Sequence, residues 1–212
     1  MSYIRDTVYI LRNEPFREHD AWITMYGREN GKLVGVARGI RRLGAKQLGH
    51  LEPLALADVM IAKGASFDKV AVARTHPSSI RSGIGKMAVA GSFTKLVDDF
   101  TREGEADDQI FDLIGEVISA ANEFQNEPSS GRARFLYAGA TLKLLDLSGY
   151  GPPLDDKVLK FMRMAAISEL ARLTAPGETL AAACEAVEEA LKQTPLHRAP
   201  HGPATLHSLL SL

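Results

Sequence analysis

The sequence predicts a two-domain α+β protein in which a small antiparallel β-barrel is followed by an all-helical bundle. Five short β-prone runs fall within the first 75 residues, and no helical stretch between them is long enough for a crossover. Beyond His76-Pro77, apolar residues recur at intervals of three and four, which is the period of amphipathic helices. Residues 1–80 carry 12 basic and 8 acidic side chains, whereas residues 81–212 carry 13 and 18. We therefore expect one domain over residues 1–78 and a second over residues 79–212.

The five predicted strands are rich in β-branched and aromatic residues. They cover residues 7–11, 21–26, 33–37, 54–62 and 69–75. Asn13-Glu14-Pro15 after the first strand is typical of a turn. Asn30-Gly31 between the second and third strands is a strong hairpin signal. This size and strand count are those of the OB-fold, which binds oligonucleotides over one face of the barrel and its loops.

The apolar pattern of the second half predicts about five amphipathic helices. They cover residues 83–100, 107–124, 132–147, 155–173 and 178–192. The third of them is apolar almost all round, so we expect it to be central. The acidic balance of this half favours a protein-binding and scaffolding module, and the tail from Thr194 is expected to be irregular.

A search for catalytic and metal-binding constellations finds no enzyme signature. The single cysteine, Cys184, excludes an intrachain disulfide and a multi-cysteine zinc site. Gly83-x-Gly85-Lys86 lacks the spacing of a phosphate-binding P-loop. No cofactor or metal is therefore predicted. The start of the chain does not resemble a signal peptide and no apolar run has the length of a membrane helix, so we expect a cytoplasmic, nucleoid-associated protein without a membrane partner.

One stretch, Gly31 to Lys46, points to a polyanionic partner. It carries five basic residues, four glycines and no acidic residue. A short apolar run leads directly into the basic cluster, as in a strand that continues into a flexible cationic loop. Such a loop suits the phosphates of a nucleic acid, which are contacted without reading sequence. The predicted phosphate contacts are Lys32, Arg38, Arg41, Arg42 and Lys46.

Other readings of these residues stay open at this point. The cationic stretch could be merely solvated, with its arginines lying over apolar surface or paired with Glu29 or Glu52. Arg132 and Arg134 are second-rank DNA candidates, because cations at a helix start oppose the helix dipole. Trp22, Tyr26 and Tyr9 offer flat faces on which bases could stack. Strand alternation would place some of these rings inside the barrel, and for Trp22 we expect the core.

Several short motifs follow one another in this chain in an order that resembles that of the RecO family of bacterial DNA repair proteins. In the N-terminal half the resemblance is carried by runs within residues 9–12, 18–21, 26–32 and 36–42, followed by Leu51-Glu52-Pro53. In the second half, residues 135–147 lead into Gly149-Tyr150-Gly151-Pro152, which is similar to the family's Gly-Tyr-x-Pro element. The likeness fades after about Leu154.

The resemblance implies a recombination mediator of the RecF pathway with an N-terminal OB-fold and a helical C-terminal domain. Such proteins are not enzymes. They bind single- and double-stranded DNA, anneal complementary strands and partner with RecR. They also engage the C-terminal tail of single-strand-binding protein and help RecA to load onto coated DNA.

One departure from the family is visible in the sequence. Many members carry a four-cysteine zinc motif just after the Gly-Tyr-x-Pro element, where this chain has Asp155-Asp156-Lys157. Two alternatives to a DNA mediator remain. One is an RNA-binding OB-fold factor, since no residue here discriminates ribose from deoxyribose. The other is a protein-interaction adaptor whose barrel does not bind nucleic acid.

Overall fold

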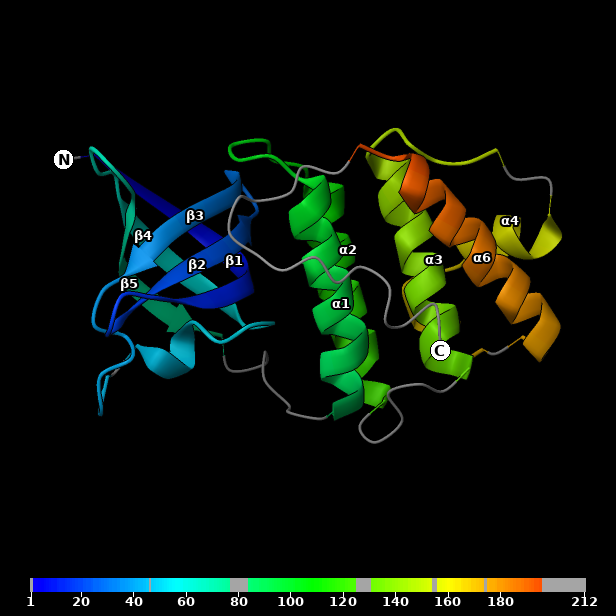
Figure 1. Cartoon of the computed structure of the whole chain (residues 1–212), viewed down its shortest axis with the longest axis horizontal. Coiled ribbons are helices and arrows are strands. Elements are labelled where there is room, and N and C mark those ends of the chain that lie inside the picture. Colours follow the sequence, from blue (N-terminus) through cyan, green and yellow to red (C-terminus); the bar gives the residue numbers. More distant parts are fainter. Residues whose placement is uncertain are drawn as a thin grey trace. The chain divides into compact units, whose positions relative to one another are not determined.

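The computed structural model describes residues 2–45, 47–76, 84–124, 131–153, 156–173 and 175–195. The chain forms two compact units (Figure 1). The first unit combines residues 1–80 with residues 101–111, and the second combines residues 81–100 with residues 112–212. The segment 101–111 thus belongs with the strands, although it lies between two helices in the sequence. The predicted boundary after residue 78 stays a prediction.

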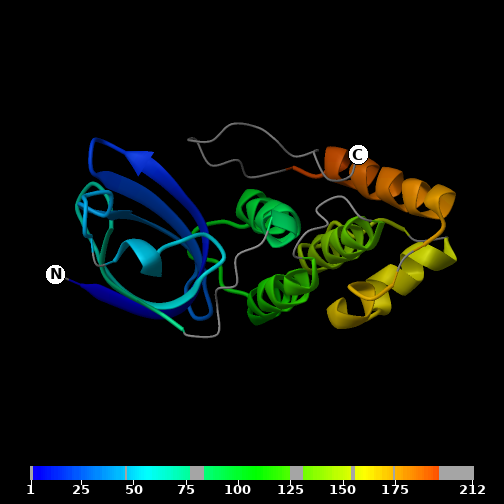
Figure 2. The ribbon, with the colours of Figure 1, turned by 90° about the horizontal axis from the view of Figure 1, so that it is seen from below.

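The first unit is a closed five-stranded β-barrel with the strand order β1-β2-β3-β5-β4, and the predicted OB-fold is confirmed. Its strands are β1 (Tyr3–Phe16), β2 (Asp20–Gly27), β3 (Gly31–Ala37), β4 (Leu56–Ala62) and β5 (Lys69–Thr75). All pairings are antiparallel except the short parallel contact of β3 with β5, at Val36 and Lys69, which closes the barrel. A short 3-10 helix, η1 (Leu48–His50), lies between β3 and β4. In Figure 2 the strands, coloured blue to cyan, curve around a common interior.

Strand β1 is much longer than predicted, because it serves two neighbours. Residues 3–9 pair with β4 and residues 8–16 pair with β2, with a register shift between Ile10 and Arg12. The predicted turn at Asn13-Glu14-Pro15 is wrong, since Pro15 is still within the strand, opposite Ala21. The chain turns instead at residues 17–19.

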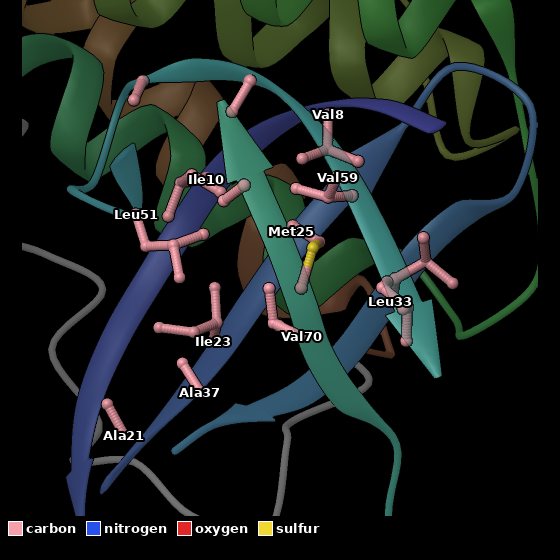
Figure 3. Packing of buried hydrophobic residues seen from close by; sticks show 14 of the residues in the cluster. Val8, Ile10, Ala21, Ile23, Met25, Leu33, Ala37, Leu51, Val59 and Val70 are labelled. Carbon is pink, nitrogen blue, oxygen red and sulfur yellow. The ribbon is translucent and has the colours of Figure 1, made fainter. Parts of the chain in front are cut away.

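The barrel core consists of the inward-facing residues of all five strands together with residues of the connecting segments. Val8, Ile10, Ile23 and Met25 point into the same interior (Figure 3) and are fully buried. The core also includes Ile40, from the connection after β3. Apolar burial at about 25 cal/mol per Å² is the main stabilising contribution to such a core.

The segment 101–111 is tied to the outer surface of β2 and β3. The amide of Gly104 donates to the carbonyl of Lys32 at 3.0 Å, and the amide of Asp107 donates to the Tyr26 hydroxyl at 3.1 Å. Gly31 has a φ of +61°, and a Cβ there would lie 2.0 Å from the carbonyl oxygen of Glu105. Only glycine fits this close approach.

The second unit contains six helices within the described residues. They are α1 (Ile84–Phe100), α2 (Asp108–Ala120), α3 (Gly131–Leu147), α4 (Lys157–Met164), α5 (Ile167–Leu170) and α6 (Gly177–Gln193), with a 3-10 turn, η2 (Ala121–Glu123), after α2. The first turn of α2 belongs to the barrel unit. Helix α3 is buried on nearly every side, which confirms its predicted central place. Gly139 in α3 lies against α5, where a Cβ would come within 2.5 Å of Leu170.

The single helix predicted over residues 155–173 is wrong. The structure has two short helices there, because the backbone is extended at Ala165 and Ala166. Asp156 caps the first of them, accepting hydrogen bonds from the amides of Val158 and Leu159 at 2.7 and 3.1 Å.

Candidate nucleic-acid interface

Three of the predicted phosphate-binding arginines lie together in one exposed loop. Residues 38–45, here called the basic loop, run from the end of β3 towards η1. Arg38, Arg41 and Arg42 are exposed, and within the described residues their guanidinium groups form no hydrogen bond or ion pair. Leu43 beside them is fully exposed. The described part of this loop therefore presents three positive charges to solvent.

The backbone of the basic loop is fixed to the turn between β1 and β2. The amide of Gly39 donates to Asp20 Oδ1 at 2.8 Å, and the amide of Arg41 donates to the carbonyl of His19 at 3.0 Å. Ile40 between them is 2% exposed and joins the barrel core. Gly39 adopts a φ of +66°, which suits glycine. The base of the loop is thus held in place while its arginine side chains remain available.

A cluster of aromatic rings lies on the outside of the barrel, around the same turn. Phe16 and Trp22 have ring centroids 4.8 Å apart, and Phe67 lies 5.8 Å from Trp22 and 6.1 Å from Phe16. All three are half-buried. The guanidinium of Arg17 lies 4.9 Å from the centre of the Phe16 ring and 5.9 Å from that of Phe67. We call Phe16, Trp22 and Phe67 the aromatic cluster.

The expectation that Trp22 belongs to the core is wrong. Ala21, Ile23 and Met25 are fully buried and point inward, so Trp22 lies on the opposite, outer side of β2. The alternation of inward and outward residues along β2 was sufficient to predict this orientation of Trp22. The sequence did not indicate Phe16 and Phe67 as site residues, because they meet only where the barrel closes and not through any local pattern.

The other two candidate stacking residues have structural roles. Tyr26 is fully buried, and its hydroxyl accepts a hydrogen bond from the amide of Asp107. Burial raises the pKa of the Tyr26 hydroxyl to about 12. Tyr9 is half-buried and packs on Phe111, with ring centroids 4.8 Å apart. The buried Tyr26 ring cannot stack on a base, and the Tyr9 ring packs on the buried Phe111.

Lys32 must be removed from the proposed phosphate contacts. It is only 5% exposed, and its Nζ donates to the carbonyl of Thr101 at 3.3 Å. The segment 101–111 covers it, so its ammonium would have to leave a buried site to meet a phosphate. Lys46 lies outside the described residues, and its part in the interface stays a prediction.

The helix arginine Arg132 is used within the helical unit. Its Nη2 donates to the carbonyl of Ala171 at 2.8 Å and to Glu123 Oε2 at 3.4 Å. Its guanidinium also lies 5.3 Å from the centre of the Phe124 ring. These contacts account for a cation at the start of α3 without a DNA role, so we do not retain Arg132 in the interface.

Arg134 is half-buried and interacts with the thiol of Cys184 on α6. Cys184 is 2% exposed, as expected for a small buried residue. Burial raises the pKa of the Cys184 thiol, and the nearby Arg134 guanidinium opposes that rise only in part. Arg134 therefore has a neighbour inside the helical unit, and we do not retain it either.

A hollow of about 560 Å³ on the barrel lies over β1, β4 and β5. Its lining is mixed in charge, with Arg5 and Arg74 beside Asp6, Glu29 and Asp58. Hydrogen bonds from Thr7 and His76 hold the pKa of the Asp58 carboxyl below its usual range, which favours its charged form. This balance suits a polyanion less well than the basic loop does.

Comparison with protein families matches two successive parts of the chain. Residues 1–78 match the family model described as "Recombination protein O N terminal", and residues 81–160 match the one described as "Recombination protein O C terminal". The chain belongs to the RecO family. The two matches follow each other in the family's own order, which confirms the resemblance seen in the short motifs.

Three relatives illustrate the similarity, each called DNA repair protein RecO. The one from Alkaliphilus metalliredigens is 26% identical over 159 residues, which cover 73% of this chain and 62% of the relative. The one from Anaeromyxobacter dehalogenans is 30% identical over 160 residues, covering 73% and 60%. The one from Bifidobacterium longum subsp. infantis is 28% identical over 160 residues, covering 75% and 66%. The chain thus spans about three-fifths of the length of the RecO relatives it matches.

The described residues were also searched for metal and membrane features. Among them, no group of three or more His, Cys, Asp or Glu side chains is arranged to hold a metal ion. No helix of the described ranges is long and apolar enough to span a membrane.

Proposed function

We propose that this chain is a recombination mediator of the RecF pathway that binds single- and double-stranded DNA through its barrel. The observation that supports this most strongly is the basic loop: three exposed arginines on a backbone that hydrogen bonds fix to the β1–β2 turn. Family membership favours DNA over RNA as the natural ligand. We propose no bond-making activity.

The proposed mechanism is electrostatic. Each phosphate that an arginine neutralises releases condensed counterions, and this release supplies affinity that does not depend on sequence. Two complementary strands held on one cationic surface repel each other less, so annealing follows without any chemical step. With RecR, the protein would then help RecA to load onto DNA coated by single-strand-binding protein.

We further propose that the helical unit binds the acidic, apolar C-terminal tail of single-strand-binding protein near α4. Phe161 and Met164 are 41% and 85% exposed on this helix. Arg163 stands between them in the sequence and pairs with Asp146, while Lys143 donates to the carbonyl of Arg163 at 2.6 Å. Apolar side chains beside two cations suit a tail of that composition.

Fluorescence anisotropy tests the DNA proposal. A labelled single strand is titrated with the protein at several salt concentrations, with the matched duplex and a matched RNA alongside. Salt-sensitive DNA binding, followed by faster annealing of strands coated with single-strand-binding protein, is the expected result. Absence of binding at low salt would overturn the proposal and favour a protein-interaction adaptor, and a clear preference for RNA would favour an RNA-binding factor.

The tail site is tested with a labelled tail peptide. The double substitution Phe161→Ala and Met164→Ala should weaken peptide binding and leave DNA binding unchanged. Wild-type peptide affinity in this variant would exclude α4 as the tail site.

A further inference from the structure

The aromatic cluster is not required by the barrel core. The core is formed by inward-facing residues such as Ile23 and Met25, and Phe16, Trp22 and Phe67 are not among them. Three aromatic rings nevertheless gather on the outer surface, where each residue is partly exposed. Exposed aromatic groups of this kind mark binding surfaces more often than scattered single side chains do.

The loop that carries Phe67 is braced by hydrogen bonds of Asp68. Lys63 Nζ donates to Asp68 Oδ2 at 2.6 Å, and the amide of Gly64 donates to Asp68 Oδ1 at 3.2 Å. A Cβ on Gly64 would lie 2.1 Å from the carbonyl oxygen of Phe67, so the turn needs glycine there. The carbonyl of Asp68 accepts the amide of Val36 at 2.8 Å, which ties this loop to β3. The residue next to Phe67 is thus hydrogen-bonded both to its own loop and to β3.

The chain turn beside the cluster is strained and carries a cation. Arg17 has a φ of +56°, a conformation that side chains other than glycine rarely adopt. This backbone places its guanidinium over Phe16 and near Phe67. The rest of the structure has to compensate for such strain, and strained residues are found most often at functional sites.

The cluster and the basic loop are linked through the same turn. His19 and Asp20 hold the backbone of the basic loop. They follow Arg17 by two and three residues and precede Trp22 by three and two residues. The aromatic cluster and the base of the basic loop therefore adjoin the same turn of the barrel unit. Proteins that bind single strands combine these two elements, a cationic track for the backbone and aromatic faces for the bases.

We propose that the aromatic cluster, with Arg17, is a stacking platform for unpaired nucleobases. The proposal rests on the proposed DNA-binding function and adds a preference for single strands to it. A duplex keeps its bases stacked inside, so it would meet the arginines of the basic loop but not the platform. Stacking is tolerant of sequence, because every base has a flat face.

Trp22 provides a direct readout, because it is the only tryptophan in the chain. Its fluorescence is followed while the protein is titrated with an oligo-dT strand, with an abasic strand of equal length, and with a duplex. The expected result is quenching by oligo-dT and little change with the abasic strand or the duplex at equal saturation. Quenching of equal size by the abasic strand would overturn the proposal.

Substitutions provide an independent test. Phe67→Ala and Phe67→Leu should each weaken binding of the base-bearing strand roughly 10-fold, with the salt slope and duplex affinity unchanged. Leucine preserves the apolar contacts of the cluster but lacks a flat ring, so a shared loss separates stacking from loop disruption. Tyr150→Ala, which removes a ring that is 43% exposed in the helical unit, is the matched control and should leave binding of the strand unchanged.

The two proposals fail in different ways. Without salt-sensitive binding of any DNA, the proposed function fails. With salt-sensitive binding that is equal for abasic and base-bearing strands, and with full affinity in both Phe67 variants, only the stacking platform fails. That second outcome would leave the aromatic cluster as a surface for a protein partner.

Discussion

Replacing the three exposed arginines of the basic loop tests the electrostatic mechanism quantitatively. In the variant Arg38→Ala, Arg41→Ala and Arg42→Ala, the backbone bonds of the loop to His19 and Asp20 are retained. Within the described residues the three guanidinium groups form no hydrogen bonds or ion pairs, so we expect the unfolding midpoint to change little. The effect should therefore appear in DNA binding alone.

The magnitude follows from counterion release. On single strands log K falls with log salt by about 0.7 for each phosphate contact. Four contacts, from the three loop arginines and the predicted contact Lys46, give a slope of about −2.8, and the variant should retain about −0.7. We assume that the wild type and the variant bind equally well when extrapolated to 1 M salt. The loss of about 2.1 in slope then makes the variant bind roughly 100-fold more weakly than the wild type at 0.1 M salt.

The assay is anisotropy of a labelled single strand at four or more salt concentrations. The matched control replaces Lys157, Lys160 and Lys192, three exposed lysines of the helical unit, by alanine. It changes the net charge of the protein by the same amount and should keep the wild-type slope. A slope that flattens by less than about 0.7 in the arginine variant, or by an equal amount in the control, would refute phosphate binding by the basic loop.

Three further predictions test the barrel. Lys32→Met should leave the salt slope of DNA binding unchanged, because its buried ammonium bonds a carbonyl; a flatter slope in the same assay would return it to the interface. Asp6→Asn should lower the free energy of unfolding, measured in urea, by about 2 kcal/mol. The reason is that the buried Asp6 carboxylate accepts three hydrogen bonds from N–H groups of residues 29 and 30. A change below about 0.5 kcal/mol would contradict this. The raised pKa of Tyr26, about 12 against about 10 unfolded, means that the folded state keeps a proton that the unfolded state loses. Stability should therefore fall as pH rises from about 10 towards 12, and fall less in Tyr26→Phe, as urea unfolding at pH 9 and 11 would show; equal losses would contradict it.

The local patterns of the sequence were enough to predict the barrel and most helices. Strands β2 to β5 lie where β-branched runs and the Asn30-Gly31 hairpin signal predicted them. The full length of β1 was not predictable in this way. Its register shift places Ile10 and Leu11 next to each other in buried positions, which interrupts the alternation, and Pro15 imitates a turn signal.

The errors in the candidate site have a different physical origin. Lys32 is buried by a segment about 70 residues further along the chain, and the strand itself gives no sign of this cover. Phe16 and Phe67 meet only because β3 and β5 close the barrel. The break between α4 and α5 falls at two alanines, which are good helix formers, so only tertiary packing distinguishes it. Exposed arginines in a glycine-containing loop are, by contrast, a local feature, and the sequence was sufficient to predict them.

The central claim is that DNA lies on the barrel, over the basic loop and the adjoining β1–β2 turn. Photo-crosslinking of the protein to a single strand that carries a photoreactive thymine analogue, with mass spectrometry of the adducts, tests this claim most directly. We predict adducts within residues 16–22, 38–45 and 63–68, and their loss at high salt. Adducts confined to residues 131–195 would contradict the account and transfer DNA binding to the helical unit.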